Sequence, residues 1–444
     1  MKISNFKLGV AAGALLMALP NVTMAETLSE SIQSDYEYLG PLFEYFHENP
    51  ELSFSEHNTS NRLAAELEAE GFEVVRGIAS TGLVGIMRNG DGPTVMIRAD
   101  MDGLPVEEKT GLPYASSAMG SYPEDDRVFN VMHACGHDMH MTSLVGVARQ
   151  MAARNDQWSG TLLLLGQPAE EAIGGAKAMV EDDLWNRVPR ADYALGLHVN
   201  STGLGGEVAF SDGLMLSSAD TMRIVVPGVG THGAQPHRGK DPVVIGSQIV
   251  MALQTIITRD ISPLEPGIIT VGAFHSGTAP NIISDQAVLD ITVRANSEET
   301  RWALQENIER VAINIGRAAG LPEDNLPVVT HLDGVPTTIN DAALAQRLHP
   351  VIEEKLVGGT IGTFTQLGMG AEDYPYLVRV DPPIPSVYFL VGGAPAAAYE
   401  ASINGGPALT GHHSPIFVID PTTSVPAGVE AMTIAALELL GNSD

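Results

Sequence analysis

Transition-metal chemistry is indicated by one dense cluster of side chains, HACGHDMH at residues 133–140, which holds three histidines, an aspartate and the only cysteine. Thiolate sulfur beside imidazole nitrogen is an environment that binds such metals. Cys135 and His137 are two positions apart, so in an extended segment both side chains would project to the same side. The alternative is a buried apolar cysteine with hydrogen-bonded histidines nearby, although a thiol that is neither buried nor metal-bound is open to oxidation.

Two adjacent glutamates follow an apolar stretch in TLLLLGQPAEE, residues 161–171. Neighbouring side chains of a regular strand face opposite ways, so Glu170 and Glu171 can serve one site only where the strand has ended, and Pro168 favours such an end. One carboxylate could then bind a metal while the other takes a proton from metal-bound water. Two solvated glutamates at a helix start are the alternative.

Other polar side chains also follow apolar stretches. His198 stands in GLHVN and His413 in GHHSPIF, and each alone is more often a hydrogen-bonded structural histidine. Asp100 and Asp102 form a D-x-D pair in ADMDGLP, with side chains on one face, as in pairs that bind a cation or orient a ligating histidine. An aspartate-rich turn is the alternative, and for Asp100 the sequence supports the turn and the metal role equally.

A third group of candidates lies in the middle of the chain. His232 is in the loop THGAQPH at 231–237, while Asn281 and Arg294 lie within or near predicted strands. A loop histidine, an amide and an arginine suit an oxyanion donor and a carboxylate clamp. By themselves they could equally be ordinary surface residues.

Regular elements must position these side chains. Apolar residues recur at helical spacing over 31–46 and 58–71, which predicts two amphipathic helices. Short apolar runs bounded by Gly, Pro or Asp predict strands at residues 83–87, 94–97, 161–165 and 193–197. Because helical or turn-rich stretches follow these strands, we expect a layered α/β domain with its ligand site where strands end.

The pattern changes after about residue 205. It predicts strands at 222–226, 268–271 and 288–293 and helices at 242–258 and 298–318. This block contains no evident metal-ligand cluster. We therefore predict that residues 213–328 form a smaller domain inserted into a larger one, which comprises residues 26–212 and 329–444.

Length and charge exclude several classes of protein. The chain has 444 residues, which is too long for one compact domain. Acidic residues outnumber basic ones by 54 to 24, and the net charge of -30 repels phosphate backbones and anionic membrane surfaces. We therefore expect no nucleic-acid partner. A single cysteine cannot close an intrachain disulfide.

The N-terminus has the features of a signal peptide over residues 1–25. Two lysines precede an apolar run from Leu8 to Leu19, and small residues around Ala25 suit cleavage. The run is shorter than the roughly 20 residues of a membrane span, and we expect no later span. The prediction is export to a periplasm or to the medium, with an uncleaved anchor as the alternative.

Taken together, the motifs HACGHDMH, QPAEE, GLHV, GTHGAQPH, APNII, GAEDYPY and HSPIF, in this order and spacing, resemble one family. It is the metal-dependent amidohydrolase family of hippurate hydrolases, N-acyl-amino-acid amidohydrolases and plant auxin-conjugate hydrolases, within the aminoacylase and carboxypeptidase G superfamily. The resemblance extends from about His47 to near the C-terminus. It implies an α/β catalytic domain with a dinuclear metal site and an inserted α+β lid that also serves dimerisation.

The resemblance also implies roles for individual residues. Metal ligands would be Cys135, His137, Glu171, His198 and His413, the last chosen over His412 because it directly precedes Ser414 and Pro415. Glu170 would be the general base and Asp102 the acid behind the metal site. Asp100 stands where many relatives have a metal-binding histidine, so its role is open. His232 would support the oxyanion in the partner subunit of a homodimer.

The implied reaction is hydrolysis of the amide bond of an N-acyl amino acid, with Asn281 and Arg294 holding the substrate carboxylate. Two divalent ions per subunit would take part, Zn or Mn, with Co or Ni as further options. Four residues depart from the family pattern: Gly166, Thr231, Met139 and Met141. They weaken the assignment of the substrate more than the assignment of the reaction. A dipeptidase or carboxypeptidase, or an exported metal- or ligand-binding protein without activity, are the alternatives.

Overall fold

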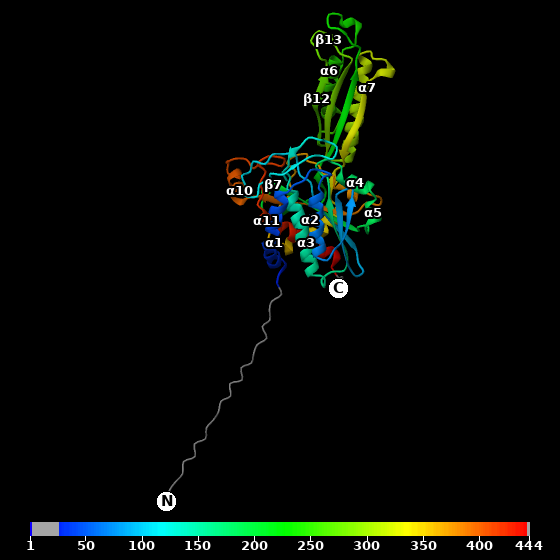
Figure 1. The fold of residues 1–444 in the computed structure, drawn as a ribbon. Helices are drawn as coiled ribbons and strands as arrows, with labels where there is room; N and C mark the ends of the chain where they lie inside the picture. The colour runs from blue at the N-terminus through cyan, green and yellow to red at the C-terminus, as the bar shows by residue number, and fades with distance from the viewer. Residues whose placement is uncertain (2–25, 442–444) are drawn as a thin grey trace.

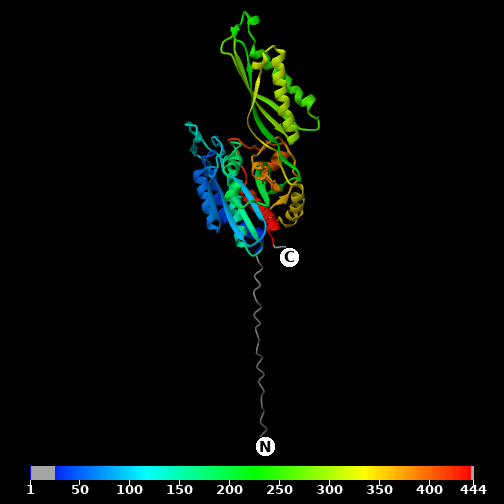
Figure 2. The same ribbon diagram turned by 90° about the vertical axis from the view of Figure 1, so that its right-hand side faces the viewer.

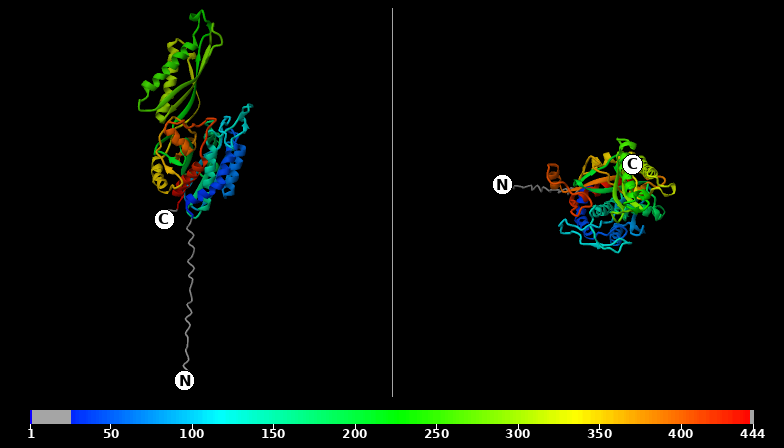
Figure 3. Two further views of the ribbon diagram at one scale, coloured as in Figure 1. Left: turned by 90° about the vertical axis from the view of Figure 1, so that its left-hand side faces the viewer. Right: turned by 90° about the horizontal axis from the view of Figure 1, so that it is seen from above.

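The computed structural model describes Met1 and residues 26–441, which form two bodies joined end to end (Figures 1 and 2). We call residues 26–217 and 336–441 the main domain and residues 218–335 the lid. The described part of the chain ends on the side of the main domain away from the lid (Figure 3). Apart from Met1, the predicted signal peptide lies outside the described residues.

The main domain is built on an eight-stranded sheet of order β1-β2-β6-β3-β7-β18-β8-β17. Its four central strands are parallel, and antiparallel neighbours flank them. The strands are β1 (Glu73–Ile78), β2 (Gly82–Asn89), β6 (Gly160–Gln167), β3 (Thr94–Asp100), β7 (Tyr193–Leu204), β18 (Ser386–Ala394), β8 (Glu207–Ala209) and β17 (Thr360–Ile361). Their buried apolar runs, such as residues 162–165 of β6, are typical of parallel strands covered on both faces.

Helices of the main domain pack against one another and against this sheet. They are α1 (Leu28–Glu48), α2 (His57–Ala69), α3 (His137–Ala153), α4 (Gly175–Glu181), α5 (Leu184–Arg187), α8 (Ala342–Lys355), α9 (Pro375–Val378), α10 (Ala396–Ile403) and α11 (Pro421–Leu440). Thr27 and Glu30 form a capping box that starts α1 ahead of the predicted position. α11 lies against α1, α3 and α8, and Gly146 of α3 permits close contact, since a Cβ there would lie 2.4 Å from Val429.

The lid is a four-stranded antiparallel sheet of order β12-β14-β10-β15 with two long helices. Its strands are β10 (Ser218–Pro227), β12 (Gly267–Ser276), β14 (Gln286–Ala295) and β15 (Val328–Val335), and its helices are α6 (Pro242–Thr255), continued by a π-helical turn (Ile256–Asp260), and α7 (Glu298–Ala318). Side chains of β14 alternate between buried and partly exposed, so one face packs on the helices. The two bodies confirm the predicted α/β class with a smaller α+β unit.

Strand pairing places both boundaries of the lid further along the chain than the prediction from the sequence. β15 pairs with β10 along most of its length, so it belongs to the lid although the prediction ended at residue 328. At the other end, β9 (Leu214–Leu216) pairs with β16 (Thr338–Ile339) in the main domain. The chain therefore crosses between the bodies at about residues 217 and 336.

The remaining short elements lie in connections: β4 (Met119–Gly120), β5 (Phe129–Asn130), β11 (Thr231–His232), β13 (Ile282–Ile283), and 3-10 turns at Pro236–Arg238 and Glu323–Asn325. We expected no membrane span after residue 25. Two helical segments nevertheless have the length and hydropathy of a membrane span, Pro242–Asp260 and Pro421–Leu440. The second window is 83% buried, which is typical of a core helix. The first packs Ile245, Ile249 and Leu253 into the lid core.

Candidate metal centre

The predicted site residues of the main domain converge at one edge of the central sheet. Asp100 is the last residue of β3, and Gln167 is the last residue of β6, just before the loop that carries Glu170 and Glu171. β3 and β6 are parallel neighbours, so these ends meet. β7 runs to Leu204, beyond the predicted end at 197, and His198 therefore lies within a strand.

Cys135 and His137 lie on a turn and a helix start, so they reach one site by another route than the extended segment considered from their spacing. Gly136 between them is left-handed, with φ of +88°, and α3 begins at His137. A Cβ at Gly136 would lie 2.3 Å from Cγ1 of Val199. A glycine is therefore required both by the conformation and by the close approach of this turn to β7.

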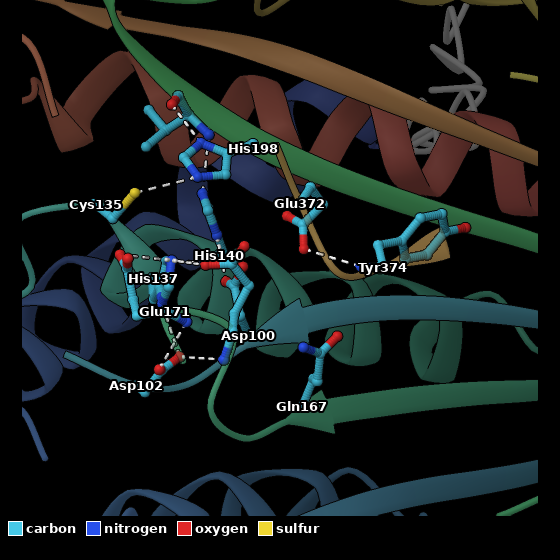
Figure 4. Close-up of polar contacts among 12 residues, drawn as sticks. Asp100, Asp102, Cys135, His137, His140, Gln167, Glu171, His198, Glu372 and Tyr374 are labelled. Atoms are coloured by element: carbon cyan, nitrogen blue, oxygen red, sulfur yellow. Dashed lines mark hydrogen bonds and ion pairs between the residues drawn. The ribbon is translucent and has the colours of Figure 1, made fainter. Parts of the chain in front are cut away.

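Five side chains from four separate segments meet here, and Figure 4 labels four of them, Cys135, His137, Glu171 and His198. Cys135 Sγ lies 3.4 Å from His198 Nε2, and His413 Nε2 lies 3.4 Å from Glu171 Oε2. His137 Nε2 is 3.9 Å from Glu171 Oε1. The donor atoms of Cys135, His137 and His198 lie within 4.8 Å of one another, as do those of Cys135, Glu171 and His413. The structure thus brings together all the residues predicted as ligands.

A divalent metal fits this arrangement. His137 Nε2 and Glu171 Oε1 are buried, yet neither has a hydrogen-bond partner among the described residues, and buried polar atoms rarely lack one. Thiol, imidazole and carboxylate are donors that Zn and related metals accept. Burial and the Glu171 carboxylate raise the pKa of the Cys135 thiol well above its usual range, so a nearby cation is needed for this thiol to ionise.

His412 is a neighbour of the cluster to which the sequence assigned no role. Its Nδ1 lies 3.7 Å from Cys135 Sγ, and its ring centre is 5.2 Å from that of His198. Burial and His413 lower the pKa of His412 to about 4, so its imidazole is neutral at physiological pH. His413, with φ of +63°, is strained and donates its backbone N–H to Ala134 O at 2.8 Å.

Asp102 lies behind the cluster, as predicted, and acts on it through the backbone. Its Oδ1 accepts from the Glu170 amide and its Oδ2 from the Glu171 amide, each at 3.0 Å. Ser53 Oγ donates to Oδ2 at 2.6 Å, and His137 Nδ1 is 3.4 Å from Oδ1. Asp102 therefore orients two consecutive glutamates through their amides and lies close to the His137 imidazole.

Asp100 forms an ion pair and a hydrogen bond behind the cluster. Arg98 Nη1 donates to its Oδ2 at 2.7 Å, and His140 Nδ1 lies 2.5 Å from its Oδ1. His140 Nε2 in turn accepts from the Val199 amide at 2.9 Å, next to His198. Both oxygens of Asp100 are thus engaged by other side chains, and its Oδ2 also lies 3.6 Å from His137 Nε2, so Asp100 supports β7 and borders the cluster.

Glu170 is surrounded by further acids. Its carboxylate lies within 4.8 Å of those of Glu372 and Asp373, which belong to the GAEDYPY motif and had no predicted role. Burial and the Glu372 carboxylate raise the pKa of Glu170 well above its usual range. Arg98 partly compensates the negative charge of these acids, because its Nη2 donates to Glu372 Oε1 at 2.7 Å. A carboxyl group with a raised proton affinity beside a metal site suits proton transfer.

The three lid candidates separate in the structure. Arg294 lines the pocket above the metal cluster, where its Nη1 approaches Met369 O at 3.4 Å. His232 and Asn281 do not line that pocket. They lie on the paired segments β11 and β13 and the loop before β13, and His232 is exposed. Within one subunit, only Arg294 can therefore meet a substrate held at the metal cluster.

The pocket has a volume of about 580 Å³, in the range that holds small ligands. Its floor carries Cys135, Glu170, Glu171, His198 and His413. Its lining also includes an apolar surface, made of the side chains of Ile173, Met215, Leu216, Phe364, Leu367, Met369 and Leu390. A ligand here would contact the metal cluster, a guanidinium and an apolar surface at the same time.

Comparisons with known proteins agree with this geometry. Residues 96–404 match the model of Peptidase family M20/M25/M40. The chain is 41% identical over 273 residues to a hippurate hydrolase of Campylobacter jejuni, covering 61% of this chain and 68% of that one. It resembles a crystal structure from methicillin-resistant Staphylococcus aureus, with TM-score 0.82, 29% identity and coverage of 94% and 100%. It also resembles YXEP of Bacillus subtilis, described as a dinuclear metal binding peptidase from the M20 family, with TM-score 0.73, 26% identity and coverage of 93% and 99%.

The family match covers most of the chain, including the lid and four of the five predicted ligands, and His413 follows just after it. A relative described as a hippurate hydrolase lies in the group of amidohydrolases that the motifs resembled, so that resemblance is confirmed. The chain therefore belongs to Peptidase family M20/M25/M40 and is a metal-dependent amidohydrolase or peptidase of that family.

Proposed function

We propose that this protein hydrolyses the amide bond of N-acyl amino acids. The observation that carries this proposal is that Arg294 lines the same pocket as Glu170 and the metal cluster. Among the described residues, no carboxylate forms an ion pair with Arg294, which is half-buried. An unpaired guanidinium in a ligand pocket suits a substrate that carries its own carboxylate.

Each group in the pocket has a defined task in this reaction. When bound, a divalent metal held by Cys135, His137, Glu171, His198 and His413 would supply Lewis-acid chemistry to the substrate carbonyl and to the attacking water. Glu170 accepts the proton of the attacking water and passes it to the amide nitrogen, so that the amine leaves neutral. Asp102 holds Glu170 at the distance that this transfer requires, through the Glu170 amide.

Arg294 gives a direct test of the carboxylate clamp. Arg294→Gln should lower kcat/KM for N-acyl amino acids by roughly 30–100-fold, chiefly through KM, because a charge-assisted hydrogen bond is lost. On substrates whose carboxylate has been amidated, the same variant should have nearly the kcat/KM of the wild type. Arg223→Gln is a matched control, since this lid arginine is exposed and pairs with Asp290 outside the pocket. Equal losses on both substrates would rule out the clamp.

The apolar surface of the pocket suggests that the acyl group is large and apolar, as in a benzoyl amide. Release of free amine should be measured on N-benzoyl and N-acetyl amino acids and on dipeptides, with Mn, Zn, Co or Ni added in turn. Preference for dipeptides would identify the peptidase that the family also includes. Absence of cleavage with every metal would favour a binding protein without activity. We propose two metal ions per subunit, Zn or Mn, which elemental analysis of the active preparation would count.

We further propose a homodimer in which the exposed His232, with Asn281 beside it, reaches the partner subunit's site and supports the oxyanion. His232→Ala and Glu170→Gln should each be nearly inactive alone. Mixed dimers of the two variants should regain activity, because one site then combines an intact Glu170 with an intact His232. If His232 acts within its own subunit, mixing gives no gain.

We propose that the protein is exported and processed after Ala25, which places it in a periplasm or in the medium. The support is the sequence of residues 1–25. Mass spectrometry of the protein recovered from its native cells should give an N-terminus at Glu26. An intact Met1 in the cell interior would contradict export.

A further inference from the structure

Glu56 is a buried carboxylate with no task in the mechanism described so far. It has 0% exposure and stands at the N-cap position of α2, but its side chain makes no capping hydrogen bond to that helix. Among the described residues it has no cationic partner. Burying a carboxylate without a counter-ion is unfavourable, so other contacts must compensate it.

Those contacts point to the loop that carries the general base. Glu56 Oε1 accepts from the Ala169 amide at 2.8 Å and from the Phe54 amide at 3.0 Å. Its Oε2 accepts from Thr81 Oγ1 at 2.7 Å. One oxygen of Glu56 therefore joins the turn before α2 to the turn that follows β6.

Glu56 and Asp102 together bind three consecutive amides. Ala169 donates to Glu56, and the next two residues, Glu170 and Glu171, donate to the two oxygens of Asp102. Both carboxylates are buried. The backbone amides of three consecutive residues, which include the base and a metal ligand, are thus all held by buried carboxylates.

Backbone strain at the two donors shows why such a clamp is needed. Ala169 has φ of +51° and Phe54 has φ of +61°, in the left-handed region that residues with a Cβ rarely adopt. A residue in this conformation is strained and persists only where its surroundings impose the conformation. Both strained residues donate to the same oxygen of Glu56.

We propose that Glu56 is a positioning residue, which through the Ala169 amide holds Glu170 and Glu171 in the geometry that proton transfer and metal binding require. This inference rests on the proposed hydrolytic function, because the position of Glu170 matters for that reaction. It assigns Glu56 no contact with the substrate.

Three variants and two measurements test this role. In Glu56→Gln the amide oxygen can accept from both backbone amides and the amide NH₂ can donate to Thr81, so the clamp is kept. Glu56→Leu fills the space but leaves both amides unpaired. Thr81→Val removes only the contact to Oε2. The first measurement is of kcat and KM at saturating metal, with metal content determined. The second is deuterium exchange, by mass spectrometry, of a peptide that spans residues 168–175, whose exchangeable amides begin at Ala169.

We expect kcat of Glu56→Leu to fall at least ~10-fold with KM changed less than about threefold, since a small displacement of a catalytic group acts on the chemical step. Exchange over 168–175 should accelerate in this variant alone, while Glu56→Gln and Thr81→Val resemble the wild type in both measurements. If Glu56→Leu does not fold, Glu56→Asp replaces it, because its shorter side chain retreats from the Ala169 amide.

Unchanged exchange and unchanged kcat in a folded Glu56→Leu or Glu56→Asp variant would overturn the proposal, as would a loss in KM alone. If Glu56→Gln were as impaired as Glu56→Leu, the charge and not the amide contact would matter, and the proposal would also fail. Inactivity of the wild type on every substrate would instead contradict the proposed function. The exchange data would then still decide whether Glu56 holds the loop.

Discussion

Replacement of Glu170 with glutamine should lower kcat by at least ~100-fold while leaving the metal content unchanged. Glutamine has the shape of the glutamate but cannot accept the proton of the attacking water. The Glu170 amide would still donate to Asp102, so the loop should keep its position. Steady-state kinetics with N-acyl amino acids, together with elemental analysis of the same samples, measure both quantities.

The matched control for this variant is Glu181→Gln, on the exposed surface of α4. It makes the same chemical change far from the pocket and should leave kcat as in the wild type. A metal-loaded Glu170→Gln enzyme with wild-type kcat would remove Glu170 from the mechanism. Loss of metal in this variant would mean that Glu170 is itself a ligand.

Removal of the metal should abolish activity and lower the melting temperature. The acids of the site then face one another without a counter-cation, and Arg98 is the fully buried cation among the described residues that remains near them. A ligand present at about 1,000 times its Kd stabilises a folded protein by about 4 kcal/mol, so the loss should be of that order. Calorimetry before and after treatment with a chelator measures this change.

Restoration with Zn or Mn separates metal loss from damage, since both activity and melting temperature should return. A Cys135→Ala variant serves as the control. Its site should bind metal more weakly, so its melting temperature should fall less on chelation than that of the wild type. An enzyme whose activity and melting temperature survive complete removal of metal would not be using this cluster for either purpose.

Much of the site could be predicted from local sequence, because several of the ligands lie next to a strand end or a helix start with its own apolar signal. Glu171 follows β6, and Cys135 precedes α3 by two residues. The family resemblance added which histidine of the pair 412–413 to choose. The detailed conformation was less accessible, since the left-handed Gly136 depends on the approach of Val199 from a distant strand.

Residues that act through long-range contacts could not be predicted. Arg98 and Glu372 are 274 positions apart, and Glu56 and Ala169 are 113 positions apart, so no spacing rule relates them. A glutamate at the start of a helix resembles an ordinary first-turn acid. Only the fold reveals that the Glu56 side chain turns away from its own helix.

The prediction of the lid's C-terminal boundary was wrong for a different reason. β15 is an edge strand whose side chains are mostly exposed, so residues 328–335 lack the alternation that marks a half-buried strand. β10 and β14, at the centre of the same sheet, alternate clearly and were predicted. Edge strands with two solvated faces are where periodicity carries least information.

Anomalous diffraction from crystals saturated with Zn or Mn tests the central claim most directly. The account predicts strong metal peaks enclosed by Cys135, His137, Glu171, His198 and His413, with the carboxylate of Glu170 beside them and not bound to an ion. A map without a peak at this cluster under saturating metal, in protein that still hydrolyses its substrate, would contradict the account.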